Sequence, residues 1–271
     1  MTDDGLNLSG RVALVTGAAG GIGTAVAERL GRQGARVVVA DLRVEMLNGL
    51  LARLGDDGIE SFALSVDVSS EEAVREMINS AEKEFGVVDL VVNNAAVGSH
   101  TRPEDLLVAD WQRVLDVDLT GYFLVATQVG RRLLSSGKPG TIVNVASIAA
   151  SSALGRGNFA YSVAKGGVLQ LTRELAVEWA RANIRVNAIQ PCQVNTSALR
   201  ALLDSVGEDR DELLTEMVRG IPLGRVAEAE DIAAAVHFLS SSAASMITGA
   251  MLPVDGGNLA LNAGGSLRPR S

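Results

Sequence analysis

Residues 11–41, RVALVTGAAGGIGTAVAERLGRQGARVVVAD, contain the pattern that decides the fold. A short apolar run, Arg11–Thr16, leads into the glycine-rich segment TGAAGGIG (Thr16–Gly23); a segment of helical period and a second apolar run ending at Asp41 follow. A strand, a tight turn and a helix in this order leave unpaired backbone N–H groups at the helix N-terminus, where the helix dipole favours a bound phosphate. The stretch therefore predicts a βαβ unit with an anion site at its turn.

The same alternation continues to the end of the chain. Further apolar runs of strand length are Ser61–Asp67, Val88–Asn93, Thr141–Ala146, Arg185–Ile189 and Ala250–Val254, and the runs Arg11–Thr16 and Arg36–Asp41 bring the total to seven. Segments of helical period separate them: Gly21–Gln33, Glu71–Phe85, Asp110–Ser136, Tyr161–Ala182 and Glu228–Ser240. Near-continuous aliphatic strands are typical of a parallel sheet that helices cover on both faces. We expect a doubly wound α/β (Rossmann) fold with a seven-stranded parallel sheet.

The alternation also predicts the domain organisation. Residues 1–271 form one domain, because no linker or internal repeat interrupts the pattern. Residues 194–224 break the alternation, and their acidic patch from Glu208 to Glu212 predicts a short helix in an insertion that lies over the site. Residues 258–271 form a polar, glycine-rich C-terminal tail. Ser69 and Ser70 before Glu71 and Glu72 predict a capped helix start.

Composition excludes several classes of protein. A net charge of −8 argues against a nonspecific nucleic-acid binder. The single cysteine, Cys192, allows no intrachain disulfide, and with the two distant histidines, His100 and His237, it argues against a zinc site. Carboxylate sites for harder ions stay open, although no metal is expected. The acidic start, MTDDGLNL, lacks the features of a secretory signal, and no apolar run reaches the length of a membrane span. We therefore expect a cytoplasmic protein with no membrane partner.

Two acidic residues at strand ends indicate a dinucleotide. Gly17, Gly21 and Gly23 do not match the general G-x-G-x-x-G fingerprint, and a tight turn that needs glycine for packing is an alternative to the phosphate site, which the loop alone favours. Asp41, however, follows Gly23 by 18 residues, close to the spacing of about 20 at which an acid reaches the ribose hydroxyls of NAD. A carboxylate there repels a 2′-phosphate, so NAD is favoured over NADP. Asp67 ends the third strand and is a looser candidate for an adenine contact.

A tyrosine and a lysine four residues apart indicate acid–base chemistry. Tyr161 and Lys165, in YSVAK, share one face of a helix, and an ammonium beside a phenol lowers the pKa of the phenol. Such a phenol can remove the proton of an alcohol. The same spacing also occurs on ordinary amphipathic surfaces. Ser147 follows the fifth strand at the edge where open α/β sheets bind ligands, and its hydroxyl can donate to a substrate oxygen. Neither histidine lies in a hydrolase motif.

In combination, these motifs resemble the short-chain dehydrogenase/reductase family. The glycine loop, Asp41, NNAA from Asn93, Ser147 and YSVAK stand in the family's order and spacing. The resemblance covers nearly the whole chain and includes WQRVLDVDLTGYF from Trp111, RVNAIQPCQVNT from Arg185, PLGRVAEAEDIAAAVHFLSS from Pro222 and ITGAMLPVDGG from Ile247.

The resemblance implies roles for individual residues. Tyr161 is the acid/base, Ser147 holds the substrate oxygen, and Lys165 binds the nicotinamide ribose and tunes Tyr161. Asp67 and Val68 meet the adenine, Asn94 lies along the ribose, and Val194 and Thr196 contact the carboxamide. The full set of cofactor-binding residues is expected to be Gly17, Ala19, Gly20, Gly21, Ile22, Gly23, Asp41, Leu42, Asp67, Val68, Asn94, Ala95, Tyr161, Lys165, Val194 and Thr196. Related proteins are commonly homotetramers, paired through the helices that begin near Asp110 and Tyr161 and through the last strand.

The sequence departs from the family pattern at three positions. Asp118 stands where the family often has an asparagine of the proton path; an ionised Asp118 cannot donate a hydrogen bond, so its place in the catalytic set is open between a relay and a structural role. Ala96 and Cys192 replace usual glycines and add side chains near the expected nicotinamide pocket. Cys192 is expected to be a small buried hydrophobe rather than a reactive thiol.

We therefore expect an NAD-dependent oxidoreductase that transfers a hydride between a secondary alcohol or its ketone and the nicotinamide. One alternative is an NADH-dependent ketoreductase acting on a 3-oxoacyl thioester. The other is a catalytically idle NAD-binding regulatory protein. His100, Leu154, Gln193 and the insertion are expected to line the substrate pocket, but their side chains do not identify the substrate.

Overall fold

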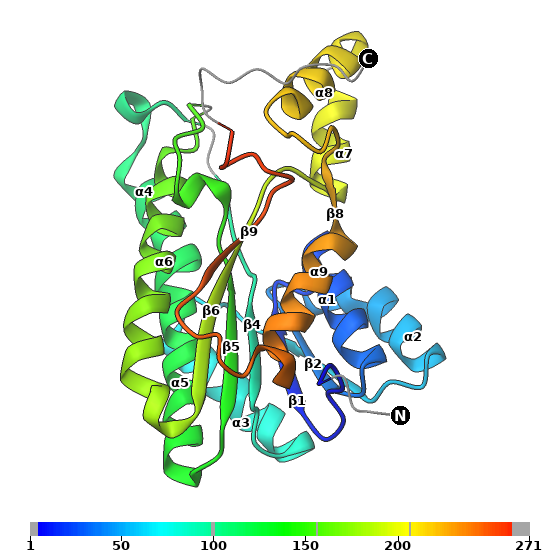
Figure 1. Ribbon diagram of the computed structural model, residues 1–271, viewed down its shortest axis with the longest axis vertical. Helices are drawn as coiled ribbons and strands as arrows, with labels where there is room; N and C mark the ends of the chain where they lie inside the picture. Colours follow the sequence, from blue (N-terminus) through cyan, green and yellow to red (C-terminus); the bar gives the residue numbers. More distant parts are fainter. Residues whose placement is uncertain (1–4, 99–100, 156, 206, 262–271) are drawn as a thin grey trace.

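The seven apolar runs form one parallel sheet in the computed structural model, which describes residues 5–98, 101–155, 157–205 and 207–261 (Figure 1). The spatial order is β3-β2-β1-β4-β5-β6-β9. The predicted fold is confirmed, and strand ends differ from the predicted ones by at most two residues. The bounds are β1 (Val12–Thr16), β2 (Arg36–Asp41), β3 (Ser61–Ser65), β4 (Leu90–Asn93), β5 (Gly140–Val145), β6 (Ile184–Pro191) and β9 (Met251–Val254).

Helices cover both faces of the sheet. One layer contains α1 (Gly21–Arg32), α2 (Asn48–Asp56) and α9 (Ala229–Ser240); the other contains α3 (Glu71–Phe85), α4 (Val108–Leu115), α5 (Gly121–Ser136) and α6 (Phe159–Trp179), as Figure 1 shows. The helix expected over Asp110–Ser136 is divided, because a π-helical turn at Asp116–Thr120 separates α4 from α5. The pattern gave no sign of α2.

Strand β2 shows why the strands are almost uniformly aliphatic. Val37 and Val39 pack into the layer of α1 and α9, and Val38 and Ala40 pack into the opposite layer. Side chains alternate between the two faces of a strand, so a strand covered on both faces needs an apolar residue at every position. Each fully buried valine contributes roughly 1.5–3 kcal/mol relative to its exposed state.

The direction of strand order reverses between β1 and β4. Strand β1 pairs with β2 on one side and with β4, 74 residues further along the chain, on the other. Connections leave the sheet in opposite directions at such a point, and this opens a crevice at the carboxyl ends of the strands. The glycine loop follows β1, Asp41 is the last residue of β2, and Ser147 comes just after β5, so all three lie at this one edge.

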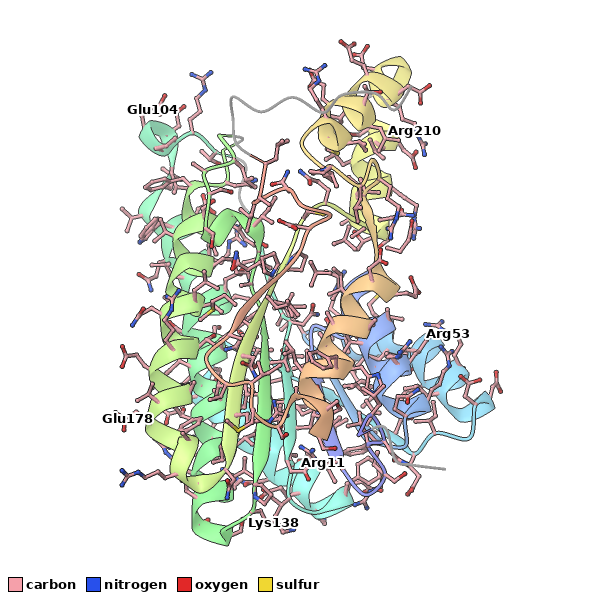
Figure 2. All side chains as sticks on the ribbon, viewed as in Figure 1. Arg11, Arg53, Glu104, Lys138, Glu178 and Arg210 are labelled. Carbon is pink, nitrogen blue, oxygen red and sulfur yellow. The ribbon has the colours of Figure 1, made fainter. Side chains whose placement is uncertain are left out.

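The insertion at residues 194–224 contains more structure than the sequence indicates. It has two helices, α7 (Ser197–Ser205) and α8 (Arg210–Arg219), instead of one short helix, and β7 (Val194–Asn195) pairs in parallel with β8 (Ala227–Glu228). Both helices lie beyond the carboxyl end of the sheet (Figure 1). In Figure 2, Arg210 at the start of α8 and Lys138, just after α5, mark opposite ends of the molecule. A role of the insertion as a substrate cover stays a prediction.

Strand β9 forms one free edge of the sheet and contains a proline. Ala188 N donates to Ala250 O, and Cys192 N donates to Val254 O. Alternate residues of a strand direct their backbone groups to the same side, so the even-numbered residues of β9 face β6. The backbone nitrogen of Pro253 therefore faces away from the sheet.

Two further expectations concern the helices. Ser70 caps α3, because its Oγ accepts a hydrogen bond from Ala73 N at 3.2 Å, as predicted. The helices in the described ranges include none with the length and hydropathy needed to span a lipid bilayer. Of the tail that begins at residue 258, only residues 258–261 are described.

Candidate active site

The glycine loop is shaped by three close approaches. Gly17 has a positive φ of 63°, and a Cβ there would lie 2.7 Å from Ala95 Cα. A Cβ at Gly21 would lie 2.9 Å from Cγ2 of Thr196, and one at Gly23 would collide with the backbone of Gly17. These three positions therefore require glycine because of close packing, and the contact at Gly21 places Thr196 against the loop.

The N-terminus of α1 differs from that of α3. Gly20 is the N-cap residue of α1; it supplies no side-chain cap, and the first turn has no acidic residue. Helix α3 has both a serine cap and two glutamates in its first turn. Within the described cap and first turn of α1, no side chain offsets the positive end of the helix, which fits a pyrophosphate bound at Gly20, Gly21 and Ile22.

A cavity of about 250 Å3 continues from this loop along the strand ends. It contains six of the residues expected around the cofactor: Gly17, Asp41, Leu42, Asp67, Val68 and Ala95. Five other residues complete its lining: Arg43, Val66, Ala96, Val97 and Val117. Ala96 thus lies in this cavity, with Asp41, and it does not line the pocket beside Ser147 described below. Arg43 and Val97 had not been anticipated.

Asp41 is fixed in place by backbone donors. Its Oδ2 accepts from Ala19 N at 3.1 Å, and its Oδ1 accepts from Arg43 N at 3.3 Å. Each carboxylate oxygen has a further lone pair, so Asp41 can still accept from two ribose hydroxyls. The carboxylate also ties the end of β2 to the glycine loop.

The side chain of Asn94 is hydrogen-bonded to the glycine loop. Its Nδ2 donates to the carbonyl oxygens of Thr16 and Gly17, both at 3.0 Å, and its backbone N donates to Thr16 Oγ1 at 3.1 Å. The side chain therefore positions the loop, and its contact with a ribose stays a prediction. Thr16 was not singled out in the sequence, although its hydroxyl links β1 to β4.

Lys165 is buried in a cluster of three acceptors. Its Nζ lies 2.9 Å from Tyr122 Oη, 3.1 Å from Val145 O and 3.3 Å from Asp118 Oδ2. Its side chain is 1% exposed and that of Asp118 is 0% exposed. The contacts with Tyr122 and Val145 are hydrogen bonds, and the contact with Asp118 is an ion pair. An ammonium has three hydrogens, so a third is available for a ribose hydroxyl at Lys165.

Asp118 contacts Lys165 directly and anchors the loop after β4. Its Oδ1 accepts from Val97 N at 2.7 Å. Burial raises the pKa of Asp118 above its usual value, while the charge of Lys165 and the hydrogen bond from Val97 oppose that rise. The carboxylate therefore has a structural role that an asparagine oxygen would share, and an electrostatic role that an asparagine would not.

Tyr161 lies at the edge of this cluster. Lys165 Nζ is 5.5 Å from the centre of its ring. Burial raises the pKa of Tyr161 above its ordinary value of 10, whereas Lys165 and a hydrogen bond with Ser147 lower it. Lys165 thus acts in the direction that the sequence predicts, but burial outweighs it in the isolated chain.

Ser147 connects the cluster to a second cavity. It follows β5, and its Oγ accepts from Ala149 N at 3.1 Å, so its hydroxyl hydrogen can be donated either to Tyr161 or to a ligand. The cavity measures about 410 Å3 and includes the predicted Leu154 and Gln193. The complete lining is Ser147, Ile148, Leu154, Asn158, Cys192, Gln193, Leu199, Leu202, Leu213, Glu216 and Met217. His100 lies outside the described residues.

Cys192 lines this cavity as a neutral thiol. Burial raises the pKa of Cys192 above its usual value, so at neutral pH the sulfur is not a thiolate nucleophile. This agrees with the expectation of a small apolar side chain rather than a reactive one.

Tyr122 is the main functional residue that the sequence analysis missed. Its Oη accepts from Lys165 and donates to Val145 O at 2.9 Å, and the side chain is buried. Its position four residues after Asp118 places both on one helical face, and this spacing is the signal that could have found it. A buried amide chain, Asn93–Asn144–Thr172, supports the same region with two bonds of 2.9 Å.

Comparisons with known proteins agree with this geometry. A family model described as enoyl-(acyl carrier protein) reductase matches residues 17–258. The D-threitol dehydrogenase of Mycolicibacterium smegmatis is 40% identical over 255 residues, which cover 94% of this chain and 95% of that protein. The chain belongs to the short-chain dehydrogenase/reductase family.

Other members of the short-chain dehydrogenase/reductase family differ in the cofactor that their names record. The NAD-dependent glycerol dehydrogenase of Listeria innocua is 38% identical and aligns over 94% of this chain and 96% of its own length. An Agrobacterium tumefaciens structure described as a 2-deoxy-D-gluconate 3-dehydrogenase holds NADP; it is 36% identical, has a TM-score of 0.86 and covers 96% of this chain and 100% of that one. This chain is thus an oxidoreductase that transfers a hydride between an alcohol carbon and a nicotinamide cofactor.

Proposed function

We propose that this chain is an NAD-dependent dehydrogenase of secondary alcohols in which Tyr161 is the acid/base. The observation that carries the proposal is the position of Tyr161 between the buried Lys165 and the hydroxyl of Ser147, beside a cavity that Ser147 lines. These groups supply a proton acceptor, a charge that favours its ionised form, and a donor for the substrate oxygen.

The residues of the chain divide the work of alcohol oxidation. Backbone N–H groups at the start of α1 hold the pyrophosphate, and Asp41 accepts from the adenosine ribose. Ser147 Oγ donates a hydrogen bond to the substrate oxygen and orients the carbinol. Tyr161 Oη removes the hydroxyl proton. When bound, an oxidised nicotinamide would supply the acceptor for the hydride of the carbinol carbon and a positive charge in the site. In the reverse direction Tyr161 returns the proton to the ketone oxygen.

Lys165 has a fixed electrostatic role in this scheme. Its ammonium is held by Asp118, Tyr122 and Val145, so its charge stays near Tyr161 in a buried site of low polarisability. By raising the pKa of Tyr161, burial alone keeps the phenol protonated at neutral pH, and a protonated phenol cannot accept the hydroxyl proton. The charge of Lys165, together with that of the oxidised cofactor, opposes this effect.

The test of the catalytic role uses Tyr161→Phe and a broad panel of secondary alcohols and ketones, followed by nicotinamide absorbance. We expect the variant to lose turnover by at least about a thousandfold while its affinity for NAD changes less than about twofold. Absence of any turnover by the wild type, with equal NAD binding by both proteins, would favour an idle NAD-binding protein instead. Exclusive activity on 3-oxoacyl thioesters would favour the ketoreductase alternative.

Asp41 supports the choice of NAD within this proposal. Its carboxylate stands at the end of β2 with capacity for both ribose hydroxyls, and it repels a 2′-phosphate. Arg43 lines the same cavity and offers the opposite charge. We expect a ratio of kcat/KM for NAD over NADP of about a hundredfold, and Asp41→Ala to reduce that ratio by at least about tenfold. A wild type that prefers NADP contradicts the role of Asp41.

Exposed apolar side chains support a homotetramer. Val108 and Phe123 are 80% and 45% exposed on α4 and α5, and Phe159 and Val177 are 45% and 78% exposed on α6. Helices carrying such residues gain stability by pairing across a symmetric interface. Light scattering coupled to gel filtration is expected to give four times the mass of the chain, and a monomer contradicts the proposal. A cytoplasmic location stays a prediction.

A further inference from the structure

The cavity beside Ser147 has predominantly apolar walls. Ile148 and Leu154 come from the loop after β5, and the other apolar walls are Leu199, Leu202, Leu213 and Met217 of α7 and α8. A substrate oxygen held at Ser147 therefore places the rest of the molecule against aliphatic carbon. Such walls favour a substrate whose body is itself apolar.

The described lining of this cavity carries negative charge and no positive charge. Glu216 lines it, and among its described lining residues there is no lysine or arginine. Glu216 is exposed, so it stands where the cavity meets solvent. Asp204 of α7 is neutralised by Arg210 at 2.5 Å, but across the described ranges no cation lies within 4 Å of the Glu216 carboxylate.

The surrounding segment strengthens this charge. Residues 197–219 contain six acidic residues against three arginines, which gives a net charge of −3. A carboxylate that enters the cavity loses water, meets no cation in the described lining and is repelled by Glu216. An uncharged substrate of the same shape suffers neither effect.

One neutral side chain in the cavity lacks a partner. Gln193 Oε1 is buried and accepts no hydrogen bond from the described residues. An unsatisfied buried acceptor is costly, so rotation of the Gln193 amide toward a ligand that brings a donor into the cavity is favoured. Asn158 lines the same cavity and can serve as a second neutral polar contact.

We propose that this cavity takes uncharged secondary alcohols with a compact aliphatic body and a second hydroxyl or amide donor, and that Glu216 is a specificity-determining residue that excludes carboxylates. The inference rests on the proposed alcohol dehydrogenase activity and names the class of its substrate. Gln193 accepts the second donor, and Ser147 receives the alcohol to be oxidised.

The test of the charge uses two substrates of similar shape, 4-hydroxycyclohexanecarboxamide and 4-hydroxycyclohexanecarboxylate, with NAD; they differ in charge and in the N–H donors of the amide, so the comparison with Glu216→Gln isolates the charge. We expect wild-type kcat/KM to be at least about a hundredfold higher for the amide. Glu216→Gln is expected to raise kcat/KM for the carboxylate about tenfold and to change the value for the amide less than about twofold. Asp211→Asn removes the same charge from the same helix but from a residue outside the cavity lining, and it should change neither value by more than about twofold.

A second pair of substrates tests Gln193. We expect Gln193→Leu to lower kcat/KM for cyclohexane-1,4-diol about tenfold and to leave the value for cyclohexanol within about threefold, because only the diol supplies the second donor.

The outcomes separate this inference from the proposed function. Equal wild-type use of the amide and the carboxylate, or a carboxylate rate that Glu216→Gln leaves unchanged, overturns the role of Glu216 while the dehydrogenase activity stands. Equal losses for diol and cyclohexanol in Gln193→Leu overturn the role of Gln193. Failure of the wild type to oxidise any secondary alcohol overturns the proposed function itself.

Discussion

Replacing Tyr122 with phenylalanine removes one hydroxyl from the centre of the buried cluster. That hydroxyl accepts from the ammonium of Lys165 and donates to Val145 O, each at 2.9 Å. A hydrogen bond to a charged group contributes about 1.5–3 kcal/mol and a neutral one about 0.5–1.5 kcal/mol, which together give roughly 2–4 kcal/mol. After the substitution, Val145 O still accepts from Lys165, and Lys165 still pairs with Asp118. One ammonium hydrogen of Lys165 loses its acceptor, but the charge keeps Val145 O and Asp118 as partners, so we expect a loss of at least the lower value, about 2 kcal/mol.

The assay is thermal and urea unfolding of both proteins at one fixed protein concentration, since subunit association also affects apparent stability. A loss of about 2 kcal/mol corresponds to a fall in Tm of about 4–8 °C for a domain of this size. Thr127→Val is a matched control, because it removes a hydroxyl from the same helix that bonds only to carbonyls of its own helix; it should change stability by less than about 0.5 kcal/mol. A change that small for Tyr122→Phe would refute the buried geometry.

The same variant has a kinetic signature. Burial raises the pKa of Tyr122 well above its ordinary value, so the hydroxyl is neutral at working pH and its removal changes no charge. We therefore expect kcat to fall through poorer positioning of Lys165, while the pH dependence of the rate keeps its shape. A shift of the whole pH profile contradicts this positioning role.

Two further substitutions test the site. Asp118→Asn removes a negative charge that raises the pKa of Tyr161, so the limb of alcohol oxidation that rises with pH should move to lower pH in nicotinamide-absorbance rates; a move to higher pH contradicts this. Gly17→Ala places a Cβ 2.7 Å from Ala95 Cα at a positive φ and should cost roughly 2–4 kcal/mol in urea unfolding, whereas Gly10→Ala, with φ of 81° and open space, should cost only about 1–2 kcal/mol; equal losses refute the packing argument.

The sheet and the positions of its functional residues could be predicted because both depend on local patterns. Aliphatic strands and the glycine turn identify β1 and β2, and the strand ends place Asp41 and Ser147 at one edge. Helix α2 was missed because Asn48–Asp56 contains two glycines and only two buried leucines, so its helical period is weak. The π-helical turn at Asp116–Thr120 was missed because a turn of five residues inside a long helical segment changes the sequence pattern too little to be recognised.

The buried cluster could be predicted only in part. The spacing of Tyr161 and Lys165 is local, but the contacts of Lys165 with Tyr122 and Val145 join residues 43 and 20 positions apart. Such contacts depend on how α5 and α6 pack against β5, and no single segment contains that information. The insertion shows the same limit: β7 pairs with β8 across 33 residues, and each strand is only two residues long.

Pro253 determines how the backbone of another molecule can pair with the edge strand β9. An exposed parallel strand offers backbone donors and acceptors to any extended segment, which makes sheet edges starting points for aggregation. The outward-facing position in the middle of this edge has no N–H, because the nitrogen belongs to the proline ring. A foreign strand therefore cannot complete a ladder there. Pro253 thus opposes backbone pairing between copies at this edge, so an interface formed through the last strand would depend on side-chain contacts instead.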